Sequence, residues 1–487
     1  MAFGNALTRW IYNQGPSALR DVMATEYSRR RSSAKYGLNF RQYLDDLERT
    51  QWYSARELQQ IQDEKARRLV WHAARHVPYY VSLIGELGLR PQDIESSDDL
   101  GRLPLLERRT VQARLGDFRS SWCRDPSEVE HFQTSGSTGT ALEVYVSRDC
   151  LQLEKAFAWQ HRHWGGVTLG DRAAQFVGFP VIPVGRKRPP FWVHDRIENR
   201  LFFSLQHMSR ANLPLYADQL ADFRPAFVAG YPTALYLMAL YLCDAGVPTV
   251  RPRAVFSASE TLLPHQRHVI EEAFKCPVFD WYGAVELVAN IVQCERGNYH
   301  IKEEYGVVQV LNADGTPTPP GQIGELVCTG LNNFAMPFIR YRVGDTAVPK
   351  EGVCPCGRGG RLVERITGRT EDVVVTPDGR YLSRLDFVFK GLTNVEEAQL
   401  IQDASDHLCI RIVPRPQFNE QDMARILSNL RERLGDEMRV EIEPVECIPR
   451  TASGKFRYVI SQVPLGLPGA QQTSELLGLT GGEAGSS

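Results

Sequence analysis

The sequence lacks the long apolar runs that membrane helices need. Its longest candidate, residues 234–243 (ALYLMALYLC), is about half of the ~20 residues that cross a bilayer, so it predicts a buried helix and no membrane span. The sequence also lacks an excess of one charge. The 56 Lys and Arg nearly balance the 58 Asp and Glu, which gives no electrostatic reason to expect nucleic acid or an anionic membrane as a partner.

A secretory signal is also not expected, because charge and Gly/Pro interrupt the first 20 residues too early. The default compartment is therefore the cytoplasm. The ten cysteines are expected to be reduced thiols or metal ligands and not a disulfide framework.

What the chain does have is enough length for two or three domains, since 487 residues exceed the ~250–300 of a single core. Residues up to about 130 are helix-rich. Beyond them, short β-branched runs alternate with amphipathic segments, which predicts an α/β fold with a largely parallel sheet. The pattern restarts after Gly368 as a small α+β domain. We therefore predict a large domain over 1–368, a small domain over 369–463 and a disordered tail over 464–487.

Particular elements follow from the same patterns. Residues 180–200, rich in Pro and Arg, predict a surface insertion or a substrate-side loop. The strands are 142–146, 226–229, 254–257, 277–282, 306–311, 324–329, 372–375, 408–413 and 440–444, and the helices 41–57, 58–76, 151–164, 211–223, 264–274 and 419–434.

A glycine-rich loop precedes the expected strand 142–146. Glycines allow a close approach of the backbone to an anion, and hydroxyl and amide groups can then hold phosphate oxygens. The loop is not a Walker A motif, because no Lys follows it. A plain hairpin turn is the alternative. The residues concerned are Thr134, Ser135, Gly136, Ser137, Thr138 and Gly139.

Three later segments carry single groups of interest. Tyr282 ends an expected strand and can stack on a flat ring, and Glu286 follows four residues later with an oxygen that Mg²⁺ can use. Asp345 follows a glycine and can accept hydrogen bonds from ribose hydroxyls. Lys455 lies in a turn-rich loop and can contact a phosphate. Taken singly, a core-rim Tyr, a solvated Glu, a turn Asp and a surface Lys explain them equally well.

Their order along the chain is more informative. TSGSTGT, YGAVE, YRVGD, GRTEDVVV and PRTASGK occur in a series that resembles the adenylate-forming enzymes. Two N-terminal phrases, RLVWHAARHVPYY (68–80) and LPLLERR (103–109), and the missing Lys after the glycine loop resemble the phenylacetate–CoA ligase branch, with its CapK-like proteins. The resemblance runs from about residue 40 to about residue 460.

The resemblance implies a large N-terminal domain, a small mobile C-terminal domain, and a role for each matching residue. It implies that the glycine loop holds the β- and γ-phosphates, that Ser259, Glu260, Tyr282 and Gly283 surround the adenine, and that Asp345 holds the ribose. Thr138 and Glu286 would meet Mg²⁺, Arg369 would approach the nucleotide, and Lys455 would drive adenylation. The hinge position is Glu371, where the family usually has Asp or Lys.

The implied activity is that of an AMP-forming ligase. ATP activates a carboxylic acid as acyl-AMP, and the thiol of CoA then displaces AMP. A second hypothesis keeps the adenylation and replaces CoA with an amine or a carrier protein in polysaccharide or secondary-metabolite biosynthesis. A third is a catalytically silent nucleotide-binding protein. Intact Thr138, Glu286, Asp345 and Lys455 argue against the third.

Four residues have the chemistry of a structural zinc site. Cys294 and His300 are paired at short spacing, and Cys354 and Cys356 form a CxC about 50 residues later. Three thiols and one imidazole fill a closed tetrahedral Zn²⁺ site, so we assign it no catalysis. Four unconnected residues are the alternative. Some phenylacetate–CoA-ligase-like proteins carry a similar site.

The acid pocket is expected among residues near the tyrosine motif. Aromatic and Pro residues suit a flat aromatic or short apolar acid, although each could equally be core. Tyr231, Pro232 and Ala284 are the candidates we favour. The wider set also includes Trp159, Trp164, Phe179 and Phe227.

Overall fold

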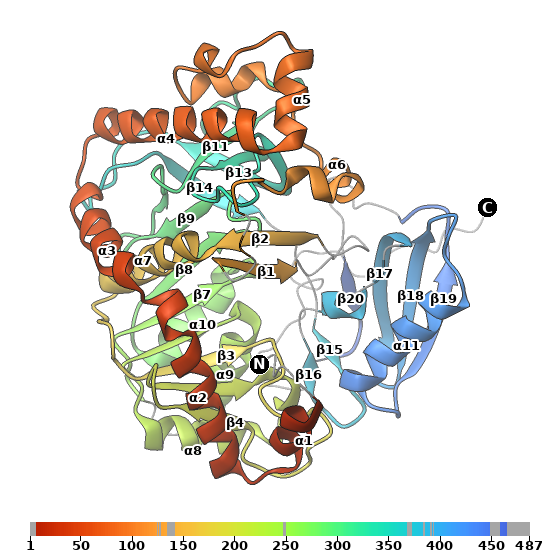
Figure 1. Ribbon diagram of the computed structural model, residues 1–487. Coiled ribbons are helices and arrows are strands. Elements are labelled where there is room, and N and C mark those ends of the chain that lie inside the picture. The colour runs from red at the N-terminus through yellow and green to blue at the C-terminus, as the bar shows by residue number, and fades with distance from the viewer. Residues whose placement is uncertain are drawn as a thin grey trace.

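A computed structural model describes most of the chain (Figure 1). The described residues are 6–123, 125, 128–133, 142–246, 250–367, 373–382, 385–389, 392, 394–448 and 458–464. None of the helices within these ranges is both long enough and apolar enough to cross a membrane.

Helices form the N-terminal part, as the sequence predicts. They are α1 (Ala6–Gln14), α2 (Ser17–Lys35), α3 (Leu38–Thr50), α4 (Ala55–His76), α5 (Pro78–Glu86) and α6 (Arg108–Ala113). The helix predicted over 41–57 extends too far, because α3 ends at Thr50 and α4 begins at Ala55. Ser54 caps a new helix there, accepting a hydrogen bond from the backbone of Glu57 while the Glu57 side chain accepts one from the backbone of Ser54.

A twelve-stranded mixed sheet forms the centre of the large unit, in the order β11-β12-β13-β14-β10-β9-β8-β7-β6-β3-β5-β4. Strands β5, β3, β6, β7 and β8 are mutually parallel, and the remaining strand pairs are antiparallel, so the expectation of a largely parallel sheet holds for only one part. The bounds are β3 (Ala173–Val177), β4 (Trp192–Asp195), β5 (Arg200–Ser204), β6 (Phe227–Gly230), β7 (Ala254–Ala258), β8 (Val278–Gly283), β9 (Asn290–Gln293), β10 (Tyr299–Ile301), β11 (Gly306–Leu311), β12 (Gly324–Gly330), β13 (Tyr341–Lys350) and β14 (Leu362–Thr367).

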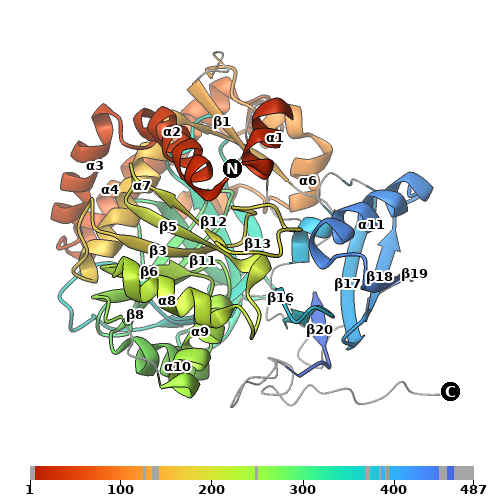
Figure 2. The same ribbon diagram turned by 90° about the horizontal axis from the view of Figure 1, so that it is seen from below.

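Helices cover both faces of the parallel strands. Alternate side chains of each strand point to opposite faces, so Phe227 and Phe256 pack against α7 (Arg148–Trp164) and α3, whereas Val228 and Val255 face the other side. That other side is covered by α8 (Leu213–Phe223), α9 (Pro232–Ala245) and α10 (Pro264–Phe274). Figure 2 shows these three helices below the sheet.

The segment 180–200 is not simply a surface insertion, which corrects the prediction. It contains β4, which pairs antiparallel with β5 at the sheet edge. Phe191 is 2% exposed and Val193 is fully buried, so both belong to the core. The segment therefore supplies the last strand of the sheet.

A smaller unit follows, drawn in blue in Figure 1. Its sheet has the order β19-β18-β17-β20, and α11 packs on it to enclose a separate apolar core. The bounds are β17 (Val395–Ala404), β18 (His407–Pro414), α11 (Glu420–Leu434), β19 (Arg439–Pro444) and β20 (Val459–Ser461). The expected strand 372–375 is a two-residue strand, β15 (Val374–Val375), paired with β16 (Tyr381–Leu382).

The hairpin of β15 and β16 joins the two units. Arg380 is 8% exposed and donates to the carbonyl of Gln206 in the large unit at 3.2 Å. It also donates to the carbonyls of Arg433 and Leu434 at the end of α11, at 2.6 and 3.0 Å. One guanidinium therefore connects the large unit to the small one.

Candidate active site and metal centre

Several of the predicted site residues lie outside the described residues. The glycine loop belongs to this group, and the described strands β1 (Val129–Gln133) and β2 (Glu143–Ser147) on either side of it pair antiparallel. The predicted site residues outside the described ranges are Thr134, Ser135, Gly136, Ser137, Thr138, Gly139, Arg369, Glu371 and Lys455.

The structure brings Tyr282 and Asp345 together, although 63 residues separate them. Tyr282 is near the end of β8, beside Gly283, and Asp345 is on β13 just after Gly344, whose φ of 86° favours glycine. The Tyr282 hydroxyl donates to Oδ2 of Asp345 at 2.9 Å. Burial and the neighbouring Asp345 carboxylate raise the pKa of Tyr282, so the hydroxyl stays protonated and orients the carboxylate.

Glu286 lies in the same region and is 8% exposed. Its Oε1 accepts a hydrogen bond from the Tyr341 hydroxyl at 3.1 Å and lies 3.3 Å from Nη1 of Arg108. Sequence reasoning missed Arg108 as a site residue. The only signal was its place in the LPLLERR phrase, because 178 residues separate it from Glu286. A carboxylate held by two donors is fixed in position, as a metal ligand needs to be.

Ser259 and Glu260 follow β7, at the carboxyl edge of the parallel strands. Ser259 has a φ of 75°, which turns the chain sharply after the strand. Oε2 of Glu260 accepts a hydrogen bond from the backbone of Thr233 at 3.1 Å, at the start of α9. This bond ties the end of β7 to the residues next to Tyr231 and Pro232.

A cavity of about 290 Å³ opens between α7 and the carboxyl ends of the parallel strands. Tyr231, Ser259 and Phe179 of the candidates line it, whereas Pro232 and Ala284 do not. Trp159 and Phe227 belong to the apolar core between α7 and the sheet, and Trp164 packs against that core. The full lining is Glu154, Ala158, His161, Arg162, Gln175, Phe176, Val177, Gly178, Phe179, Ala229, Gly230, Tyr231, Phe256, Ser257, Ala258, Ser259 and Trp281.

Gly178 shapes this cavity through its missing side chain. A Cβ at this position would lie 2.6–2.9 Å from ring atoms of Tyr231. Any larger residue would therefore displace the Tyr231 ring from its place in the cavity wall.

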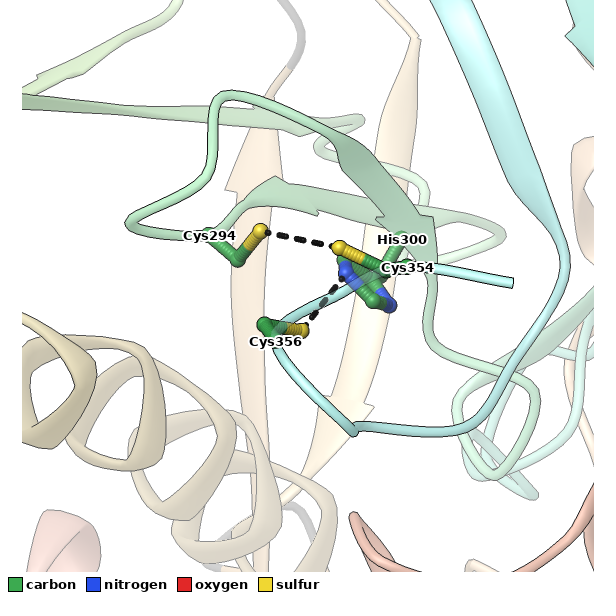
Figure 3. Close-up of side chains that lie close together, drawn as sticks. All are labelled: Cys294, His300, Cys354 and Cys356. Atoms are coloured by element: carbon green, nitrogen blue, oxygen red, sulfur yellow. Dashed lines mark hydrogen bonds between the residues drawn. The ribbon is translucent and has the colours of Figure 1, made fainter. Parts of the chain in front are cut away.

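The predicted metal ligands converge (Figure 3). One ligand atom from each of Cys294, His300, Cys354 and Cys356 lies within 4.8 Å of every other. Sγ of Cys294 is 3.6 Å from Sγ of Cys354, and Sγ of Cys356 is 3.5 Å from Nε2 of His300. A tetrahedral ion with bonds of about 2.0–2.3 Å requires ligand separations of this size.

Neighbouring groups orient these ligands. Nδ1 of His300 is 3.1 Å from the carbonyl of Gly359, which leaves Nε2 facing the three thiols. The Asn298 amide donates to Sγ of Cys354 at 3.2 Å. Burial lowers the pKa of His300 to about 4, so its imidazole is neutral at pH 7, the form that coordinates metals. The donor set therefore fits a structural zinc ion.

Comparison with known proteins extends these observations. A family model described as the CapK C-terminal domain matches residues 374–462. Protein CapK of Staphylococcus aureus is 23% identical over 464 residues, covering 94% of this chain and 100% of that protein. The phenylacetate–coenzyme A ligase of Thermus thermophilus is 24% identical over 435 residues, covering 83% of this chain and 96% of that protein.

Among solved structures, that of 2-hydroxyisobutyryl-CoA ligase in complex with 2-HIB-AMP and CoA is similar in fold. It aligns with a TM-score of 0.56 and 20% identity over 85% of this chain and 91% of that chain. The α/β architecture with a separate C-terminal unit is thus the fold of that CoA ligase. Together these similarities support a place for the chain among the adenylate-forming enzymes, on the branch that holds the phenylacetate–CoA ligases and CapK.

Proposed function

We propose that this chain is an AMP-forming acid–CoA ligase. The observation that supports the proposal is the proximity of Tyr282, Asp345 and Glu286, three residues of the motif series, in one region of the large unit. Relatives named phenylacetate–coenzyme A ligases, similar over most of the chain, support the same activity.

In the proposed reaction a carboxylate oxygen of the acid attacks the α-phosphorus of ATP. The bond between the α-phosphorus and the bridging oxygen breaks, and pyrophosphate leaves with the electron pair. The CoA thiolate then attacks the acyl carbon, and AMP leaves as acyl-AMP becomes a thioester. Asp345 would bind the ribose hydroxyls, and the ring of Tyr282 would lie against the adenine together with Gly283, Ser259 and Glu260.

Positive charge is needed where the transition state gathers negative charge on the α-phosphate. Lys455 would supply it from the small unit, and the glycine loop would hold the β- and γ-phosphates. Mg²⁺, when bound, neutralises phosphate charge, and Glu286 and Thr138 would hold it. The surroundings of Glu286 suit a Mg²⁺ ligand, because Tyr341 and Arg108 hold its buried carboxylate in position.

The small unit would act as a lid, with the division of the chain at 368–369 and the hinge at Glu371. A separate apolar core supports an independent small unit. Arg380 contacts both units. One lysine on a separate unit allows the same cleft to serve adenylation and thioester formation in turn.

An ATP–pyrophosphate exchange screen over aromatic, aliphatic, dicarboxylic and amino acids tests the adenylation step. Mass spectrometry of the products with CoA tests the acceptor. We expect acid-dependent exchange and an acyl-CoA product. AMP release with an amine or a carrier protein, but not with CoA, would favour the alternative acceptor. ATP binding without exchange across the whole panel would favour a silent nucleotide-binding protein.

We also propose that Cys294, His300, Cys354 and Cys356 bind one structural Zn²⁺. The convergence of three thiols and one imidazole supports this proposal. The ion would join the β9–β10 turn to the segment between β13 and β14, next to the strand that carries Asp345. Metal analysis of the purified protein is expected to give one zinc per chain, and a value well below one would exclude it.

A further inference from the structure

The face of α7 that lies over the sheet carries charge where apolar residues are expected. Glu154, Ala158, His161 and Arg162 follow each other at helical spacing and together line the cavity. A helix that covers a sheet normally turns an apolar stripe toward it. Charge that is partly withdrawn from water is unfavourable unless it is paired, so the half-buried Glu154 and Arg162 call for a functional explanation.

The cavity exists because small residues meet across it. Ala158 of α7 faces the layer that holds Ala229 and Ala258, and the aromatic rings of Phe256 and Trp281 complete the walls. The space of about 290 Å³ is close to the lower end of the ~300–1,000 Å³ of small-molecule sites.

Arg162 lies at the deep end of the cavity. Its guanidinium carbon is 5.6 Å from the ring centroid of Phe227, which is the first residue of β6. Tyr231 follows the last residue of β6, and Ser259 the last residue of β7, so both lie at the opposite end. An acid that enters past Tyr231 and Ser259 therefore points its tail toward Arg162.

The Arg162 side chain has no direct anionic partner among the described residues, although the carboxylate of Glu198 acts on it from a greater distance. Its guanidinium stacks on Trp159 at 4.8 Å and on Phe227, and it has no hydrogen bond or ion pair from its side chain within the described ranges. Glu154 lies two helical turns away, about 12 Å along the helix axis. The Glu154 carboxylate is hydrogen-bonded to Tyr305, and its Oε2 has no hydrogen-bond partner among the described residues.

The surroundings of Arg162 add further positive charge. Lys35 and Arg200 share one carboxylate, that of Glu198, at 2.5 and 3.1 Å. Arg200 also donates to Oε1 of Gln175, a cavity residue, at 3.3 Å. Lys155 is close enough that burial together with Lys35, Arg200 and Arg162 lowers its pKa to about 8. Lys35, Lys155, Arg162 and Arg200 thus interact with only two carboxylates in this region, those of Glu198 and Glu154.

We propose that the acid activated by this chain carries a second anionic group at the end opposite its reacting carboxylate, and that Arg162 binds that group. This inference rests on the proposed function and replaces the aromatic or short apolar acid suggested by the sequence with a dianionic acid. Arg162 is the specificity-determining residue because a planar guanidinium pairs with a carboxylate or phosphate through two parallel hydrogen bonds.

Matched pairs of acids test the proposal. Hexanoate is compared with adipate, and phenylacetate with 4-carboxyphenylacetate, by exchange kinetics and by calorimetric binding. ω-Phosphorylated acids of the same length form a further arm that separates a carboxylate tail from a phosphate tail. We expect at least one dianionic acid to bind or react about tenfold or more better than its monoanionic partner. Equal or better use of the monoanionic acids would overturn the proposal.

Variants assign the preference to Arg162. We expect Arg162→Met to raise the KM and Kd of the dianionic acid about tenfold or more, with the monoanionic acid changed little. Arg162→Lys is expected to recover part of the affinity, because it keeps the charge. Arg148→Met, at an exposed position of the same helix, is the matched control and is expected to have no effect. An equal effect of Arg162→Met on both acids, in a folded protein, would contradict the proposal.

Calorimetry separates this inference from the proposed function. If no acid supports exchange but a dianionic acid binds in an Arg162-dependent manner, the binding proposal stands and the ligase activity fails. If monoanionic acids support exchange and dianionic acids do not, the ligase activity stands and this proposal fails. If no dianionic acid binds by either measure, the proposal is wrong.

Discussion

The Tyr282 hydroxyl donates a hydrogen bond of 2.9 Å to Oδ2 of Asp345, which links the end of β8 to β13. The bond fixes one carboxylate oxygen of Asp345 beside the ring of Tyr282. A ring and an oriented carboxylate side by side match the two parts of a nucleoside, a flat base and a ribose.

Replacing the two partners should affect ATP binding unequally. Hydrogen bonds to a charged group contribute about 1.5–3 kcal/mol, so we expect Asp345→Ala to weaken ATP binding about 10- to 100-fold. Tyr282→Phe keeps the ring and loses only the orienting hydroxyl, so its effect should stay within about fivefold. Calorimetric titration with ATP measures both. Unchanged binding by Asp345→Ala would contradict the ribose assignment.

Glu286→Gln should reduce the exchange rate about 10²-fold and raise the Mg²⁺ concentration that exchange needs, because the metal-binding charge is lost. The amide oxygen can still accept from Tyr341 and Arg108, so the fold should be preserved. Glu432→Gln, at an exposed position of α11 in the small unit, is the matched control. The same Mg²⁺ dependence in Glu286→Gln as in the unmodified protein would exclude this role.

Removing the proposed zinc should destabilise the large unit without removing a catalytic group. We expect Cys354→Ser, or treatment with a strong chelator, to lower the melting temperature by about 5 °C or more and to lower the zinc content. Cys243→Ser, which changes an exposed cysteine, is expected to alter neither. Identical melting curves for Cys354→Ser and Cys243→Ser would indicate four uncoordinated side chains.

Arg380→Ala should loosen the attachment of the small unit. The change leaves the carbonyls of Gln206, Arg433 and Leu434 without this donor, at a cost of about 2–4 kcal/mol. Limited proteolysis and thermal melting should report earlier cleavage or melting of the small unit. Arg439→Ala removes an exposed arginine paired with Asp406 and should behave like the unmodified protein. Equal protease resistance of the two variants would show that Arg380 does not hold the units together.

The sequence allowed much of the fold to be predicted because local patterns determine it. The range expected for the strand 306–311 and for the helix 264–274 is that of β11 and α10, and alternation of strands with amphipathic helices indicated the α/β class. The edge strand β4 was not predicted, since Pro and Arg surround the short apolar run that holds Phe191 and the β4 residue Val193. Its pairing with β5 depends on tertiary contacts.

The site was predictable only where a motif carried it. Tyr282, Asp345 and the four metal ligands were named from the sequence, and the structure brings them together in two groups. The pairing of Arg108 with Glu286 spans 178 residues and has no local signal. The charges of α7 could be read from the sequence, but which side of the helix faces the cavity could not, because that depends on how the helix packs on the sheet.

The most direct test of the account is ATP–pyrophosphate exchange in the unmodified protein and in Lys455→Ala, with calorimetric ATP binding measured in parallel. The account predicts acid-dependent exchange that falls by about 10²-fold or more in Lys455→Ala, while the Kd of ATP changes little. Undiminished exchange in Lys455→Ala with the cognate acid would contradict it.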